Sequence, residues 1–105
     1  MGKVYIIQDA GILDFSKAKK YGELVPMIEE SIFPNSDQQQ ICNVVDTIKT
    51  KLKDFNPAND YILLTGDPLS ILITALVLSG MGIFYVICLK WDRELKDYYR
   101  VIVNI

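Results

Sequence analysis

The chain has 105 residues, of which half are hydrophobic and 23% are charged, and its formal net charge is -2. This composition is typical of a folded domain and excludes a disordered tail. The slightly acidic balance argues against nucleic acid as the main partner. The absence of histidine also excludes a nucleophile activated by histidine and a zinc site with histidine ligands. We predict one domain over residues 1–105.

The N-terminal third predicts two strands. Residues 3–8 (KVYIIQ) are a short run of β-forming residues, and residues 12–20 are a polar connection with a helical turn starting near Ser16. Residues 21–29 predict the second strand. Since Pro26 has no backbone N–H, we place this strand at a sheet edge or at a bulge.

An amphipathic helix follows these strands. Asn35 or Ser36 is its expected cap, with Gln38 or Gln39 in the position of a capping box. Pro57 and its Asn and Asp neighbours then end the helix. Five apolar residues at helical spacing form one stripe: Ile41, Val44, Val45, Ile48 and Leu52.

The second half of the chain predicts a helix between two buried strands. Residues 61–66 and 82–90 are apolar on both faces, and the helix over 68–79 is apolar nearly all round, so we expect it to be deeply packed or covered by a partner. This unit has the length of a parallel crossover, and residues 98–105 predict a strand antiparallel to the one before it. The order β-β-α-β-α-β-β predicts a small α/β fold with a mixed five-stranded sheet in two or three layers, Rossmann-like or flavodoxin-like.

Three features bear on where the protein resides. The segment 68–89 is uncharged and long enough to cross a bilayer, but helix-stop residues at 79–82 divide it, so we expect no membrane span. Residues 3–8 are too short for the apolar region of a signal peptide. Cys42 and Cys88 each lie in an apolar segment, which favours buried free thiols. We therefore expect a cytoplasmic protein.

The turn TGDP joins the strand at 61–66 to the apolar helix. Asp67 occupies the N-cap position and Pro68 the first helical position. Pro68 removes one backbone N–H, and the Asp67 carboxylate would take another where a phosphate would lie. With Gly66 as the only glycine of the turn and no lysine after it, the dinucleotide and nucleoside-triphosphate fingerprints are absent. The turn predicts a helix cap, and a bound phosphate or nucleotide is the alternative.

A metal site is a second use of the same region. Ligands of open parallel sheets lie beyond the carboxyl ends of the strands. Asp9 follows the first strand and Asp67 the third, while Lys90, Trp91 and Asp92 follow the fourth. If the first and third strands are neighbours, the two carboxylates would meet at one edge and could hold Mg²⁺. The alternative is that both are turn and cap residues only.

The final turn of the chain predicts a surface that binds a protein. Trp91 and Arg93, together with Tyr98 or Tyr99, are our candidate anchors, since a few aromatic and arginine side chains carry most interface energy. For Trp91 the alternative is ordinary packing. A weak nucleic-acid-binding module is a further alternative, and it would use four basic residues: Lys17, Lys19, Lys20 and Arg93.

The predicted sheet is too large for its helices. Two helices cannot cover both faces of five strands, so we expect a homodimer or a higher oligomer. The last strand, 98–105, also offers an edge, although Arg100 would discourage open-ended pairing.

Several segments resemble a group of small proteins of tailed bacteriophages. They are YGELV at 21–25, DYILLTGDP at 60–68 and LKWDR at 89–93, and the resemblance spans nearly the whole chain. It implies a viral accessory protein acting in a bacterial cytoplasm, and it carries over no catalytic residue. We therefore predict a non-enzymatic viral protein that binds itself and a host or viral protein.

Overall fold

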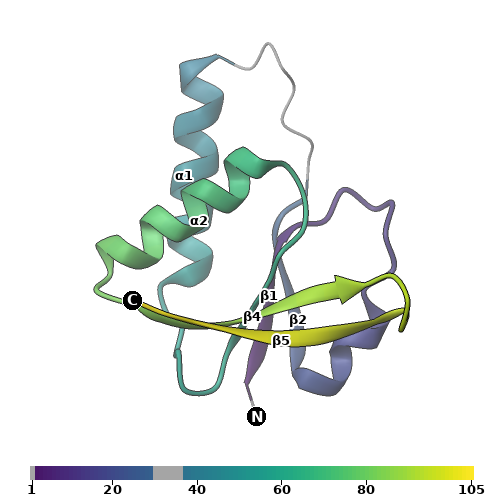
Figure 1. The fold of residues 1–105 in the computed structure, drawn as a ribbon. Helices are drawn as coiled ribbons and strands as arrows, with labels where there is room; N and C mark the ends of the chain where they lie inside the picture. Colours follow the sequence, from purple (N-terminus) through teal and green to yellow (C-terminus); the bar gives the residue numbers. More distant parts are fainter. Residues whose placement is uncertain (1, 30–36) are drawn as a thin grey trace.

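The computed structural model describes residues 2–29 and 37–105. Figure 1 shows a twisted sheet with two helices packed beside each other on one side of it. The elements of the described residues, in chain order, are β1 (Lys3–Gln8), the 3₁₀ helix η1 (Ser16–Tyr21), β2 (Glu23–Ile28), α1 (Gln38–Leu52), β3 (Tyr61–Leu63), α2 (Pro68–Gly80), β4 (Tyr85–Asp92) and β5 (Asp97–Asn104).

The five strands form one mixed sheet in the order β2-β1-β3-β4-β5. The first four strands are parallel, and β5 is antiparallel to β4. The predicted α/β fold with its mixed five-stranded sheet is therefore confirmed. The strand that contains Pro26 lies at an edge, and the first and third strands are neighbours.

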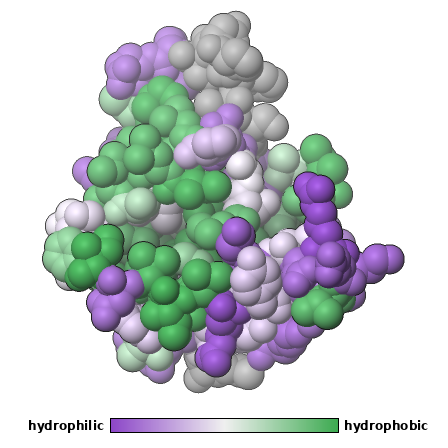
Figure 2. Space-filling view, viewed as in Figure 1, coloured by the Kyte–Doolittle hydropathy of each residue, from purple (hydrophilic) through white to green (hydrophobic). Residues whose placement is uncertain are grey.

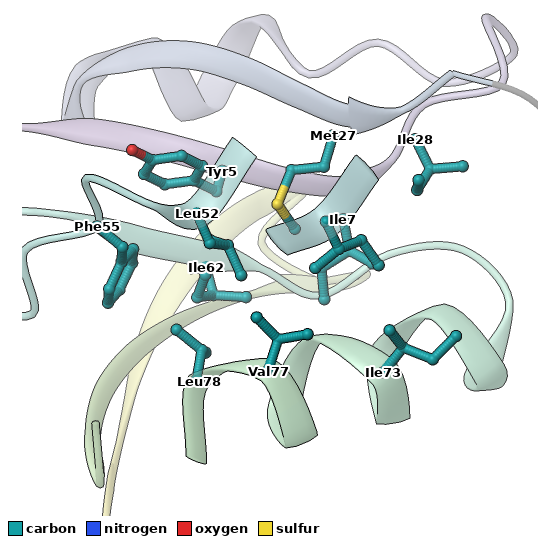
Figure 3. Packing of buried hydrophobic residues seen from close by; sticks show 11 residues of the cluster. Tyr5, Ile7, Met27, Ile28, Leu52, Phe55, Ile62, Ile73, Val77 and Leu78 are labelled. Carbon is teal, nitrogen blue, oxygen red and sulfur yellow. The ribbon is translucent and has the colours of Figure 1, made fainter. Parts of the chain in front are cut away.

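The two faces of the sheet are covered unequally. Both α-helices pack on one face, where buried side chains of β1, β3, α1 and α2 interlock (Figure 3). On the other face, Phe15 and Ala18 of the η1 region pack on one part of the sheet. The side chains they meet there come from β1, β3, β4 and β5: Val4, Ile6, Leu63, Leu89 and Tyr98.

Each α-helix begins at an aspartate. The cap of α1 is Asp37, which accepts a hydrogen bond from the Gln40 backbone N–H at 2.9 Å, while the Gln40 side chain accepts one from the Asp37 N–H at 3.1 Å. The prediction of Asn35 or Ser36 as the cap was therefore wrong, because Asp37 and Gln40 form the capping box later in the chain. Asn35 and Ser36 themselves lie outside the described residues. Asp67 caps α2 through the Leu69 N–H at 2.8 Å, with Pro68 as the first helical residue.

The strand expected over 21–29 begins only at Glu23, because Tyr21 belongs to η1, and two other strands differ more in their bounds from those expected. β3 spans only three residues, because the chain turns away after Leu63 and reaches Gly66 with a φ of 100°. β4 begins at Tyr85, since Gly82, with a φ of 78°, and the residues after it complete the end of α2. It runs on to Asp92, so Lys90 lies within the strand and not beyond it.

The structure also tests the predictions made for the two cysteines and for the uncharged segment at 68–89. Cys88 is buried in β4, and this burial raises the pKa of its thiol. Cys42 is exposed, so the prediction that it is buried was wrong. It follows Ile41 on α1, and one residue along a helix rotates a side chain by about 100°, which takes it off the apolar stripe. In the described part of the chain, the structure has no helix long and apolar enough to span a membrane.

Candidate functional site at the carboxyl edge of the sheet

The carboxyl ends of β1, β3 and β4 surround two adjoining hollows. One has a volume of about 500 Å³ and is lined in part by Gln8 and Asp67. The other has a volume of about 400 Å³ and is lined in part by Trp91 and Tyr98. Both hollows share Leu13, Phe15 and Thr65, so we treat them as one site, the carboxyl-edge surface.

The turn after β3 is held by the end of β1. The side-chain oxygen of the buried Gln8 accepts a hydrogen bond from the Asp67 backbone N–H at 2.6 Å. A Cβ atom at Gly66 would lie 2.4 Å from the Gln8 Cβ, so only glycine allows this approach. With the Asp67 and Leu69 N–H groups engaged and Pro68 lacking one, few donors remain at the start of α2 for a phosphate.

The two aspartates proposed as metal ligands both make local hydrogen bonds. Asp9 accepts one from the Gly11 N–H at 2.9 Å, and Asp67 accepts one from the Leu69 N–H. Because β1 and β3 are neighbours, the structure places both residues at the same edge of the sheet. Over residues 2–29 and 37–105 it shows no group of three or more histidine, cysteine, aspartate or glutamate residues that could hold a metal ion.

Trp91 is the most exposed aromatic ring of this surface, with 43% of the residue accessible to solvent. Its ring meets Tyr98 edge-on at 5.0 Å between centroids, and the Lys17 Nζ lies 5.8 Å from the Trp91 centroid. The two aromatic residues are opposite each other in a pair without backbone hydrogen bonds, where cross-strand side chains are closest. Tyr98 itself is buried, and its burial raises the pKa of its hydroxyl.

The other residues predicted around this turn are separated by the alternation of the strand. Tyr99 is exposed, but it pairs with Lys90 on the opposite face of the hairpin from Trp91. Arg93 is exposed in the turn itself. The structure therefore brings Trp91 and Tyr98 together and places Tyr99 elsewhere.

A comparison with protein families places the chain in a known group. The model of the family described as Phage Pam3 gp32-like protein matches residues 2–105. The chain belongs to this family. The match confirms the resemblance to small phage proteins, and it covers both the TGDP turn and the LKWDR segment. The searches of curated proteins and of solved structures found no match.

In this phage protein, two of the basic residues predicted to contact nucleic acid bind the hairpin. The Lys17 ammonium donates a hydrogen bond to the Lys96 carbonyl, and the Lys20 ammonium pairs with the Asp97 carboxylate. The hydrogen bond from Lys20 lowers the pKa of the Asp97 carboxyl and ties η1 to the start of β5. Lys19 and Arg93 are exposed.

Sequence reasoning missed the loop that forms one wall of the site. Residues 12–20 were predicted as a polar connection with a helical turn starting near Ser16, and η1 confirms that turn. However, Ile12 and Leu13 are exposed apolar residues that line the hollows, and Phe15 is buried beneath them. Two adjacent aliphatic residues in an otherwise polar loop were the available signal, because exposed large apolar side chains in loops often mark a contact surface.

Proposed function

We propose that this protein is a non-enzymatic bacteriophage accessory protein that binds another protein through the carboxyl-edge surface in the bacterial cytoplasm. The observation that carries the proposal is Trp91, a partly exposed ring fixed by Tyr98 and Lys17 at the rim of an apolar hollow. A fixed aromatic ring at such a rim loses little conformational entropy on binding, which is the property of an interface anchor.

The lining of the hollow indicates what the partner presents. Leu13, Phe15 and Leu63 form an apolar floor and wall of this hollow, and the exposed Ile12 lines the adjoining one. Such a site accepts a protruding aliphatic or aromatic side chain of a partner protein, since burying one is worth roughly 1.5–3 kcal/mol.

The test is affinity capture from a bacterial lysate with the wild-type chain, Trp91→Ala and Tyr99→Ala. Tyr99 is the matched control because it is an aromatic residue of similar exposure on the opposite face of the same hairpin. We expect one specific protein to be captured by the wild type and Tyr99→Ala, and capture to fail with Trp91→Ala.

A fluorescence titration then tests direct contact. Trp91 is the only tryptophan of the chain, so its emission reports on this surface alone. Addition of the purified partner should shift the emission to shorter wavelength, because binding removes water from the ring. Equal capture by Trp91→Ala, or recovery of nucleic acid alone that nuclease or moderate salt removes, would contradict the proposal and favour the nucleic-acid alternative.

A Mg²⁺ site at Asp9 and Asp67 is the second candidate, and the adjacency of β1 and β3 favours it. Calorimetry with Mg²⁺ or Mn²⁺ tests it on the wild type and on Asp67→Asn. Asparagine caps helices about as well as aspartate does, so this variant removes the charge and keeps the cap. Heat that disappears in Asp67→Asn would support the site, and absence of heat with both metals would exclude it.

A further inference from the structure

The two edges of the sheet differ in their protection against pairing. At one edge, β2 contains Pro26, which removes a backbone donor from that strand. At the other edge lies β5, with eight residues and no proline, and no strand of the described residues pairs with its outer side. Arg100 is the only charged residue from Tyr98 to Ile105.

The hydrogen bonds of β5 show which of its backbone groups face outward. The Ile105 N–H donates to the Phe84 carbonyl at 2.9 Å, and the pairing of β4 with β5 continues without a bulge. Every second residue of an antiparallel strand bonds to the same neighbour. Val103 and Val101 therefore point their backbone groups toward β4, while Arg100, Ile102 and Asn104 point theirs away from the sheet.

Both faces of this strand carry exposed apolar side chains near its end. Ile102 is 60% exposed on the face that carries η1, and Ile105 is 92% exposed. On the helix face, Val103 and Ile105 form one side of a hollow of about 470 Å³, and residues of α2, among them Ala75 and Leu78, form the other. Figure 2 shows the apolar surface continuing over α2, where Leu72 and Leu76 are exposed, toward the end of the hairpin where the C-terminus lies.

We infer that β5 pairs antiparallel with β5 of a second copy, about a two-fold axis at Ile102. In this register Ile102 faces Ile102 of the second copy, and Val101 faces Val103 of the second copy on the helix side. Aliphatic β-branched residues thus meet on both faces, which stabilises cross-strand pairs. The two sheets become one, and the hollows above them lie on the same side.

The charge of the strand selects this register. An axis at Arg100 would place two guanidinium groups opposite each other, and an axis at Val101 would leave them diagonal neighbours about 7–8 Å apart. With the axis at Ile102, Arg100 faces Asn104 of the second copy. Four residues of strand, about 13 Å, then separate the two Arg100 positions, which exceeds the screening length of about 8 Å at physiological salt.

The exposed area matches a modest dimer. With about 150–250 Å² for a large side chain, five residues near the edge present on the order of 500 Å² in all: Phe84, Tyr85, Ile102, Val103 and Ile105. Specific interfaces begin at about 600 Å² for each partner, and the backbone of β5 adds the remainder. The pairing also lies at the opposite end of the hairpin from Trp91, so it goes beyond the proposed function.

Charge reversal at the axis tests the pairing and its register together. Sedimentation of the wild type at micromolar concentration should give twice the chain mass of 11.9 kDa. Ile102→Lys and Ile102→Glu should each be monomeric there, with dissociation constants raised about tenfold or more, because like charges would be directly opposite. A mixture of the two chains should restore the dimer.

Ile102→Thr is the matched control, since threonine keeps the β-branched shape and carries no charge. It should remain mostly dimeric, and circular dichroism should show all four chains folded, because Ile102 contributes little to the core of one chain. A monomeric wild type would overturn the inference, as would dimers of both charged variants. A mixture that stays monomeric would overturn the register. Trp91→Ala should remain dimeric, which separates this test from that of the proposed function.

Discussion

The two ends of the β4–β5 hairpin are built in opposite ways. At the turn end, exposed groups are held by specific contacts: Trp91 by Tyr98, and the Asp97 carboxylate by Lys20. At the other end, Phe84 and Ile105 share a backbone hydrogen bond, and their side chains lie exposed beside other apolar residues. One hairpin therefore carries, at its turn end, a surface whose side chains are fixed by specific contacts and suited to a specific partner. At its other end it carries an apolar, self-complementary surface suited to a second copy.

The difference originates in the local sequence. At the turn, the Asp92 side chain accepts hydrogen bonds from the backbone N–H groups of Glu94 and Leu95, and Lys96 adopts a φ of 52°. These contacts fix the loop without help from the core. At the other end, residues 101–103 are β-branched and depend on neighbours for burial. A fixed loop presents side chains, whereas an open edge requires a partner strand.

The largest effect should come from the middle of the hairpin. Leu89 is fully buried beneath the turn end, so Leu89→Ala should lower the free energy of unfolding by about 2–5 kcal/mol. Ile102→Ala, on the same hairpin, should cost less than about 1 kcal/mol when dimers are absent, because that side chain is largely exposed. Urea unfolding at submicromolar concentration measures both. Equal losses would show that the open end is packed within one chain.

A smaller loss of stability at the turn end should show whether Trp91 serves mainly to bind a partner or mainly to pack within the chain. Trp91→Ala should lower the free energy of unfolding by about 1–2 kcal/mol, through loss of the edge-on contact with Tyr98 and of part of its buried area. Thermal unfolding followed by circular dichroism gives the value. A loss comparable to that of Leu89→Ala would mean that Trp91 is mainly a packing residue.

The smallest effect should be a pH dependence confined to the turn end. The hydrogen bond from Lys20 lowers the pKa of Asp97 in the folded chain. The contribution of this hydrogen bond to stability is therefore complete above the ordinary carboxyl pKa of about 3.9. It is lost as the pH falls through the lower pKa that Asp97 has in the folded chain. Trp91 emission followed from neutral pH into this acid range should change in the wild type.

Asp97→Asn is the control for this titration. Asparagine can still accept the hydrogen bond from the Tyr98 N–H, but it has no proton to gain. The emission change should then be reduced. Dimer formation should not depend on Asp97 over the same range, since no aspartate or glutamate lies from Tyr98 to Ile105. A change of mass with acid that Asp97→Asn abolishes would argue against the separation of the two ends.

Much of the fold could be predicted because its patterns are local. Two-sided apolar runs indicated β3 and β4, Pro26 indicated an edge, and the glycines after Ser79 indicated the end of α2. The misplaced cap of α1 shows the limit of such reasoning. Several residues before that helix have side chains able to cap it, and only the position of the first helical turn decides among them.

The candidate site could be predicted less well, because it depends on contacts between distant segments. The contact of Trp91 with Lys17 joins residues of β4 and η1, and no spacing within the sequence reports it. The placement of Tyr99 away from Trp91 follows from the register of β5, which cannot be known before the strand bounds are known. The loop at Ile12 lacked any periodic pattern.

The interior position of β1 in the sheet has a consequence for how the chain reaches its native state. Its neighbours are β2, close in sequence, and β3, and the Lys3 N–H bonds to the Asp60 carboxylate across 57 residues. Closing such a loop costs entropy before its contacts form, so this step should limit the folding rate. During synthesis, β1 can pair with β3 only after α1 and β3 have left the ribosome, while the β4–β5 hairpin joins strands that are adjacent in the chain and can close within microseconds.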